Sequence, residues 1–530
     1  MALQTTVRVR GISLEGTEAR LVTVEARFES SDSGRTEVHM TGLPDAVVRE
    51  SKNRLLAALS SLRMRVPPGR LLIHLAPAGM RKTGEALDLP LALAVASACG
   101  HLQPKSLRGT IFLGELGIDG SLHGVPGGLA AAQAGQLADL HRLVAPAPTA
   151  LEAACLQSCE VYAAGNLAQV MRWTVSGEGL ARPPAPDLAL PLTRAAGPGL
   201  EGIRGHALGK RALAVAASGG HGLLLMGPPG TGKSLLARAL LHLVPPPSLE
   251  ERMDITRVQA ATGRWAGRLA DRRPFRAPHH TTSTAGLVGG GNPIQPGEIT
   301  LAHEGVLFLD ELPEFQRDAL ESLREPLDSG QISLARAGRR LNLPAKLRLV
   351  CAMNPCPCGF RGHALRPCRC SPHDIRRYQR RISGPLLDRI ELRLELNAPD
   401  LRELIGGRPP AVAKERPASA HPGAPGSALE DDLQASYQRA IGEALERSRA
   451  RQGPRPNASL DSTELERHAP LCAATRELLI QAAERRALSA RAVQSLRRVA
   501  RTLADLGADE QVREEHLREA LALRAPLLED

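Results

Sequence analysis

The chain has 530 residues and a formal net charge of +11, and 43% of its residues are hydrophobic although only 2% are aromatic. A chain of this length exceeds one hydrophobic core, so we expect about three domains whose interiors are filled by leucine, alanine and valine. The sequence has no signal peptide and no long uncharged apolar run, which argues against a membrane protein and predicts a cytoplasmic one. The positive charge suits a polyanionic partner such as DNA without requiring one.

Residues 1–175 form the first predicted unit. Alternating or continuous apolar residues predict strands at 6–9, 19–28, 71–75 and 109–113, and helical spacing predicts helices at 45–59 and 87–98. This mixture indicates an α+β domain. The segment 176–199 is rich in proline and glycine and predicts a semi-rigid linker.

The next segment carries the clearest chemical signal in the chain. An apolar run at 223–226 predicts a buried parallel strand that leads into a glycine-rich turn and then a helix. The turn matches the phosphate-binding P-loop, GxxxxGK[ST]: Lys233 is expected to reach the β and γ phosphates of ATP, and the Ser234 hydroxyl to ligate Mg²⁺. The predicted nucleotide-binding residues are Gly227, Pro228, Pro229, Gly230, Thr231, Gly232, Lys233, Ser234 and Leu235.

A second apolar strand, at 305–309, ends in two carboxylates. Asp310 is expected to hold Mg²⁺ together with Ser234, and Glu311 to polarise the water that attacks the γ phosphate. Two parallel strands place these motifs at the carboxyl edge of one sheet, where ligands bind in α/β folds. We therefore expect an ATPase site.

A helix at 317–328 and a hairpin with a basic tip are expected to follow. The hairpin arginines are Arg336, Arg339 and Arg340. They would either contact a DNA backbone by charge or form a solvated turn. A third core strand at 347–353 ends at Asn354.

Two cysteine pairs separated by nine residues follow this strand: Cys356, Cys358, Cys368 and Cys370. Four thiolates can hold a tetrahedral Zn²⁺, although CxxC is the more usual spacing, so free thiols packing a loop are the alternative. We expect a structural or loop role for His279 and His280 and no metal there, because adjacent residues of a strand would face opposite sides.

The remaining chain is expected to be a flexible proline-, alanine- and glycine-rich linker at 406–428 and a helical lid at 429–530. The apolar spacing predicts helices at 433–451, 473–486, 490–506 and 514–523.

Several long segments resemble one family. TGLPDAVVRESKNRLLAAL, HLAPAGMRKTGEALDLPLALAVA, GELGIDGSLHGVPGGL and FRAPHHTTSTAGLVGGGNPIQPGEITLAHEGVLFLDELPEF are similar to the YifB/ComM magnesium-chelatase-like ATPases. The resemblance implies an α/β protein whose P-loop AAA+ core (200–405) has a parallel sheet, follows an α+β Lon-protease-like (S5 domain 2-like) domain and precedes the lid. The Lon-type serine and lysine are absent, since the chain reads Lys82-Thr83-Gly84-Glu85-Ala86 and Ala130 at those places, so we expect no peptidase.

The resemblance also assigns roles within the ATPase site. Ile203 would contact the adenine, or would simply begin a helix. Asn354 would orient the attacking water, Arg389 would reach the γ phosphate of a neighbouring subunit, and Arg491 would lie over the nucleotide. An arginine acting in trans requires a ring, expected to be a hexamer.

The function implied by the family is a DNA helicase or translocase that promotes branch migration during natural transformation and recombination. Two other interpretations stay open: a chelatase-like motor that remodels a metal-inserting enzyme, and a chaperone-like ATPase that engages protein partners through residues 1–175.

Overall fold

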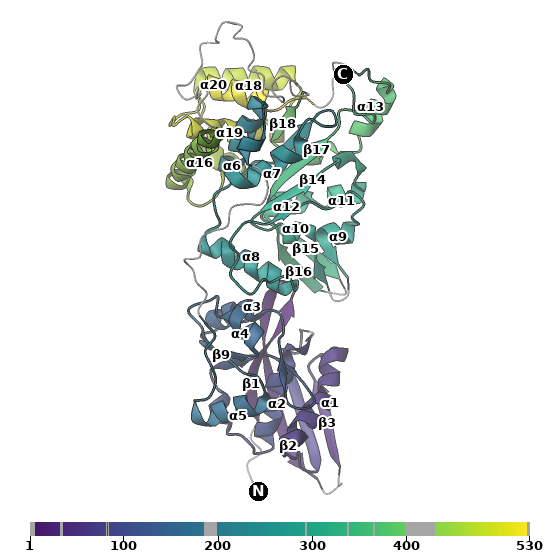
Figure 1. The fold of residues 1–530 in the computed structure, drawn as a ribbon, viewed down its shortest axis with the longest axis vertical. Coiled ribbons are helices and arrows are strands. Elements are labelled where there is room, and N and C mark those ends of the chain that lie inside the picture. Colours follow the sequence, from purple (N-terminus) through teal and green to yellow (C-terminus); the bar gives the residue numbers. More distant parts are fainter. Residues whose placement is uncertain are drawn as a thin grey trace.

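The computed structural model describes residues 6–31, 35–80, 82, 84–184, 199–291, 294–336, 339–363, 366–397 and 430–526. Figure 1 shows an elongated molecule with the N-terminal unit at one end, a sheet-containing domain in the middle and the C-terminal helices at the other end. The predicted linker at 406–428 lies outside the described residues, as does most of the one at 176–199. No helix of the described ranges is long and apolar enough to cross a membrane.

The N-terminal unit contains a mixed seven-stranded sheet in the order β3-β4-β2-β1-β5-β8-β9. Helix α2 is buried along nearly its whole length, which explains why its sequence, DLPLALAVASA, is apolar on every side. The strands are β1 (Val7–Glu15), β2 (Glu18–Ser30), β3 (Thr36–Thr41), β4 (Gly69–Ala76), β5 (Thr110–Phe112), β8 (Arg142–Ala145) and β9 (Glu160–Ala163), and a small hairpin comprises β6 (Glu115–Leu116) and β7 (Leu122–His123). The helices are α1 (Ala46–Ser61), α2 (Asp88–Ala98), α3 (Gly128–Leu137), α4 (Ala147–Ala153) and α5 (Leu167–Ser176).

The central domain is built on a five-stranded parallel sheet in the order β11-β14-β17-β10-β18. Its strands are β10 (Leu223–Met226), β11 (Phe275–Arg276), β14 (Val306–Leu309), β17 (Arg348–Met353) and β18 (Leu392–Glu395). Leu223 and Leu225 pack on one face, whereas Leu224 and Met226 pack on the other. Because both faces are covered, the strand reads as a continuous apolar run.

Helices and a hairpin surround this sheet. The longer helices are α6 (Ala207–Gly219), α7 (Lys233–Leu243), α8 (Leu249–Ala261) and α13 (Pro372–Gln379). Shorter ones are α9 (Thr284–Val288), α10 (Glu298–Leu301), α11 (Arg317–Glu321), α12 (Arg324–Ser329) and α14 (Gly384–Leu387). The hairpin comprises β15 (Gln331–Arg336) and β16 (Arg339–Pro344), and a smaller ribbon comprises β12 (Gly289–Gly290) and β13 (Gln295–Pro296).

One predicted helix is interrupted. Instead of a single helix at 317–328, the chain forms α11 and α12, with a break at Ser322 and Leu323. Pro326 explains the break, because it lacks the N–H that a continuous helix would donate to the carbonyl of Ser322. The prediction of one helix was wrong.

The C-terminal helices pack on the same core as α6 and α7. They are α16 (Glu430–Gln452), α17 (Ser462–His468), α18 (Ala473–Arg485), α19 (Ala490–Leu506) and α20 (Glu514–Ala522). Helix α19 begins where Ser489 caps it by accepting from the Ala492 N–H at 3.1 Å. His221, just before β10, bonds Thr502 of α19 at 2.7 Å, so a buried polar contact joins the sheet to this helical region.

The N-terminal unit contacts the central domain at two places. Leu269 and Met253 of the central domain pack into an N-terminal core cluster, and Arg257 donates to Gln133 at 3.4 Å. The turn between β1 and β2 meets the hairpin: a Cβ atom at Gly16 would lie 2.6 Å from a methyl carbon of Leu343.

Candidate nucleotide-binding site

The strand order brings three functional loops together at one edge of the central sheet. Strand β17 lies between β10 and β14, in parallel register with both. Asn354, which follows β17, therefore lies between the P-loop after β10 and Asp310 after β14. This is the carboxyl edge, where α/β folds bind ligands.

Lys233, the first residue of α7, is buried with only 9% of its surface exposed. Its Nζ atom donates to the carbonyl oxygens of Gly227 (2.7 Å) and Pro228 (2.9 Å) and to Oδ1 of Asn354 (3.2 Å). Burial lowers the pKa of the ammonium group, an effect opposed by the nearby charges of Asp310 and Glu311. The P-loop lysine and the predicted Asn354 are thus in direct contact.

The glycines of the turn fit a phosphate cradle. Gly230 and Gly232 both have φ near +80°, a conformation that glycine adopts without strain. A Cβ atom on Gly230 would meet nothing within 4 Å, so the turn faces open space there. At Gly227 a Cβ atom would come within 2.5 Å of the Leu396 carbonyl oxygen, which leaves no room for a side chain. The backbone N–H groups at the start of α7 can face an anion in that space.

Two oxygen ligands of the kind that Mg²⁺ prefers lie side by side. The Ser234 hydroxyl donates to Oδ2 of Asp310 at 3.0 Å. Glu311 has a left-handed backbone (φ 53°), and its N–H donates to Oδ1 of Asp310 at 2.9 Å. This turn directs the chain away from the strand and leaves the Glu311 side chain exposed. The pair fits a Mg²⁺ ligand set.

His280 is a residue at this edge that the sequence analysis did not assign. Its Nδ1 atom lies 2.9 Å from Oε2 of Glu311, and its ring stacks on His279 with ring centroids 4.1 Å apart. Both histidines lie in the loop beyond β11, which ends at Arg276, so the loop position that we expected for them is confirmed and the alternation of a strand does not apply to them. Pro278, which cannot donate to a strand ladder, was the available signal.

Ile203 is buried in the core shared by α6, α7 and the sheet, with 4% of its surface exposed. It follows the short 3₁₀ turn at Leu200–Gly202 and precedes α6. This burial suits an apolar helix entry, while a role at the adenine stays a prediction.

Arg389 and Arg491 meet at one carboxylate. Nε of Arg389 donates to Oδ1 of Asp328 at 2.9 Å, and Nη2 of Arg491 donates to the same oxygen at 2.9 Å. These two arginines lower the pKa of Asp328 against the opposing effect of its partial burial. Their hydrogen bonds thus join α12, the turn after α14 and the start of α19, rather than joining either arginine to the P-loop of its own chain.

The hairpin forms as predicted, with Ile332 paired to Leu343 and Leu334 to Leu341. The side chains of the three predicted DNA-contacting arginines, Arg336, Arg339 and Arg340, lie outside the described residues.

The four predicted zinc ligands converge. One sulfur from each of Cys356, Cys358, Cys368 and Cys370 lies within 4.8 Å of all the others. The Cys356–Cys358 distance is 3.4 Å, and Cys368 lies 3.6 Å from each of them. Four thiolates bound tetrahedrally to zinc would be separated by about 3.8 Å, given Zn–S bonds of about 2.3 Å. N–H groups of Phe360 and Arg369 lower the pKa of Cys358 to about 6, which favours the thiolate.

This loop also lies against the P-loop. A Cβ atom at Gly359, where φ is +81°, would lie 2.9 Å from Pro229 Cδ and 3.8 Å from Asn354 Cγ. The cysteine cluster is therefore adjacent to the candidate nucleotide site.

Family models match three parts of the chain. The model described as magnesium chelatase, subunit ChlI, matches residues 199–404, a second ChlI model matches residues 24–149, and a ChlI C-terminal model matches residues 433–524. The matched ranges include the P-loop, the Asp310–Glu311 pair, Asn354 and both arginines that bind Asp328.

Full-length relatives agree with these matches. The chain is 37% identical to uncharacterized protein YifB of Salmonella typhimurium and 36% identical to that of Escherichia coli, over 96% of this chain and 95% of each relative. It is 35% identical to competence protein ComM of Haemophilus influenzae, over 96% of both chains. The chain belongs to the YifB/ComM family of magnesium-chelatase-like proteins.

Proposed function

We propose that this protein is an AAA+ ATPase that hydrolyses ATP and acts on DNA. The observation that carries the proposal is the contact between Ser234 and Asp310 beside the buried Lys233. A hydroxyl and a carboxylate 3.0 Å apart can ligate one Mg²⁺, and an ammonium group beside them can bind phosphate oxygens.

Each side chain has a distinct task in this mechanism. Lys233 would exchange its carbonyl partners for the β and γ phosphates, and Asn354, now its hydrogen-bond partner, would orient the attacking water. Glu311 would accept a proton from that water, and His280 holds the Glu311 carboxylate in position until substrate binds. Bound Mg²⁺ would neutralise the charge that develops on the phosphates.

The contact at Asp328 supports an assembly in which active sites are shared. Arg389 and Arg491 bind one carboxylate together, so both are available to the same neighbouring ligand. We propose that Arg389 leaves Asp328 and reaches the γ phosphate of an adjacent subunit in a ring, which in this family would be a hexamer, and that Arg491 leaves it to lie over the nucleotide. Arginines supplied in this way raise phosphoryl-transfer rates by roughly a thousandfold or more.

For the biological role, we propose a cytoplasmic DNA translocase or helicase that promotes branch migration during natural transformation and recombination. The support is the full-length similarity to a relative named competence protein ComM. The hairpin β15–β16 would follow the phosphate backbone through Arg336, Arg339 and Arg340. The seven-stranded N-terminal domain is proposed to have the Lon-protease-like fold and to serve as a scaffold or a contact for protein partners.

The cysteine cluster is proposed to hold one structural Zn²⁺. Its sulfur spacing and the N–H groups directed at Cys358 fit four thiolate ligands. The ion would fix the loop that packs on Pro229.

The deciding experiment is an ATPase assay with no DNA, single-stranded DNA or forked DNA, each at low and high salt. DNA stimulation that weakens with salt is expected, because contacts to phosphates release counterions. Robust hydrolysis that ignores every DNA would refute the DNA role and favour a chelatase-like or chaperone-like ATPase that remodels proteins.

A further inference from the structure

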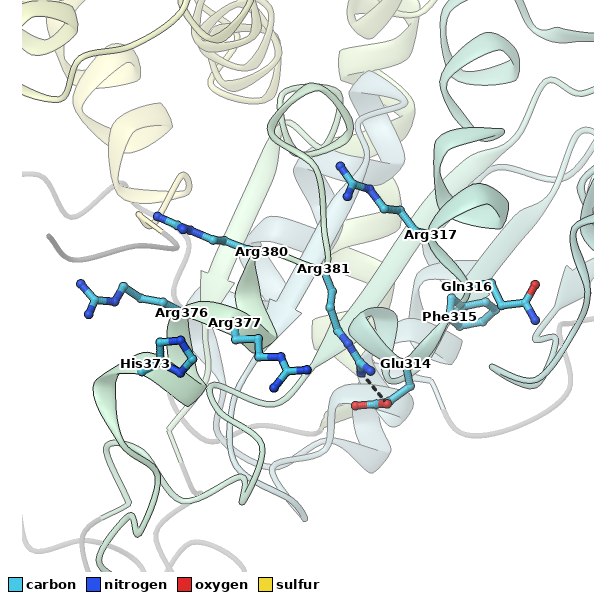
Figure 2. A pocket seen from close by; sticks show the side chains of 9 residues that line it. All are labelled: Glu314, Phe315, Gln316, Arg317, His373, Arg376, Arg377, Arg380 and Arg381. Carbon is cyan, nitrogen blue, oxygen red and sulfur yellow. Dashed lines mark hydrogen bonds and ion pairs between the residues drawn. The ribbon is translucent and has the colours of Figure 1, made fainter.

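An arginine-lined groove lies between α13 and the segment that follows β14. Its volume is about 700 Å³, and its basic lining residues are Arg317, His373, Arg376, Arg377, Arg380 and Arg381. Glu314 is the only carboxylate among the lining residues, and it binds Arg381 at 2.8 Å. Figure 2 shows Arg377 and Arg381 directed toward Glu314, while Arg376 and Arg380 extend away from it along α13.

The positive charge of this groove is largely uncompensated. In the part of the chain that the structure describes, no carboxylate lies within 4.0 Å of the guanidinium nitrogens of Arg317, Arg376, Arg377 or Arg380, and all four residues are exposed. The sequence around the groove has the same bias: residues 361–381 contain seven arginines and a single acidic residue, Asp374. Asp374 is used locally, since it completes a capping box with Ser371 at the start of α13.

Helix α13 is held rigidly on its other side. Tyr378 and Gln379 are buried, and the Gln379 amide donates to the Pro355 carbonyl at 3.4 Å. Burial raises the pKa of Tyr378 to about 12, and the nearby Asn354 backbone N–H opposes this rise. The exposed arginines and the residue that contacts Lys233 are thus joined through one short helix.

We propose that this groove is a second nucleic-acid-binding surface, which grips the phosphate backbone of DNA independently of the β15–β16 hairpin and transmits its occupancy to Asn354. Several guanidinium groups in an open groove suit a chain of phosphates, because each arginine can bind phosphate oxygens in a bidentate manner while the bases stay unread. This inference rests on the proposed function, because it names a further surface through which the same DNA is bound.

The test compares full-length variants by the anisotropy of a labelled single-stranded oligonucleotide at several salt concentrations. The variant Arg376→Gln/Arg377→Gln/Arg380→Gln should bind at least about tenfold more weakly at low salt. The slope of log K against log salt should fall by about 2, because each phosphate that the variant no longer neutralises reduces the slope by roughly 0.7. DNA stimulation of ATP hydrolysis should fall as well.

Two matched variants separate charge from position. Arg65→Gln/Arg70→Gln/Arg108→Gln removes the same charge from exposed positions of the N-terminal domain and should bind like the wild type. Replacing Arg376, Arg377 and Arg380 by lysine keeps the charge and should preserve most of the salt slope. Equally weakened binding in the two glutamine variants would overturn the proposal, since net charge alone would then explain it.

The remaining outcomes distinguish failure of this inference from failure of the proposed function. If the wild type binds DNA and the α13 glutamine variant binds it equally well, this inference fails while the proposed function stands. If the wild type binds no DNA, both fail. If the α13 variant binds DNA normally but no longer assembles with an ATP analogue in size-exclusion chromatography, the groove is a subunit contact and the proposal is overturned.

Discussion

Replacing Glu311 by glutamine isolates the chemical step of the proposed mechanism. The substitution keeps the shape of the side chain but removes the group that would accept the proton of the attacking water. A positioned general base contributes about 10²–10⁴ in rate, so kcat should fall by that factor, or about 3–5 kcal/mol in activation free energy. The Glu311 side chain is 54% exposed, so the free energy of unfolding should change by less than about 0.5 kcal/mol.

The assay measures single-turnover ATP hydrolysis and, separately, the affinity of a fluorescent ATP analogue. Affinity should be unchanged within about threefold, since Lys233, Ser234 and Asp310 remain. The matched control is Glu250→Gln, at an exposed position in the first turn of α8, which should hydrolyse ATP like the wild type. Hydrolysis by Glu311→Gln within threefold of the wild type would refute the assignment of Glu311 as the base.

Three further changes test other parts of the structure. Gly227→Ala places a methyl group 2.5 Å from the Leu396 carbonyl oxygen. The substitution should lower the free energy of unfolding, measured by thermal denaturation, by about 1–3 kcal/mol and should weaken nucleotide binding. A variant with the stability and nucleotide affinity of the wild type would contradict the packing described. Burial lowers the pKa of His303 to about 3, so the fold keeps this imidazole neutral. The contribution of this neutral imidazole to the free energy of unfolding is fully present above the unfolded pKa near 6.5. About 2 kcal/mol of that contribution is lost by pH 5, because the unfolded chain binds a proton that the folded chain does not. His303→Asn should therefore lose less stability than the wild type between pH 7 and 5 in denaturant titrations, and parallel losses would show that His303 is not the cause. Metal analysis of the purified chain should find about one zinc, which Cys358→Ser/Cys368→Ser should lose; four titratable thiols with no metal would exclude the site.

The elements predicted most accurately carry their boundary signals in the local sequence. The strand Leu223–Met226 and the helix Ala490–Leu506 match their predicted ranges, the first because it is apolar throughout and the second because Ser489 caps it. The P-loop and Asp310 meet because each ends a buried strand of the same parallel sheet. The local sequence pattern and the order of strands in the sheet are therefore enough to predict the centre of the candidate nucleotide site.

Features that depend on distant partners could not be predicted in this way. The contact of His280 with Glu311 and the sharing of Asp328 by Arg389 and Arg491 join segments far apart in the chain. The arginine groove was in part visible, because the run of arginines at 361–381 is evident in the sequence. What the sequence did not reveal is that the buried side of α13, opposite its exposed arginines, packs against the segment that contains Asn354 and Pro355.

The contact between Gly16 and Leu343 has a mechanical consequence. The turn of a long two-stranded ribbon, β1–β2, packs directly on the root of the hairpin, where a Cβ atom at Gly16 would lie 2.6 Å from Leu343 and 3.0 Å from Leu341. A tilt of the hairpin would push on the β1–β2 turn. Because β1 and β2 lie in the middle of the seven-stranded sheet, the sheet would resist that movement. We therefore expect the N-terminal domain to stiffen the hairpin and to be displaced when the hairpin moves, although the residues proposed to bind ATP all lie in other domains.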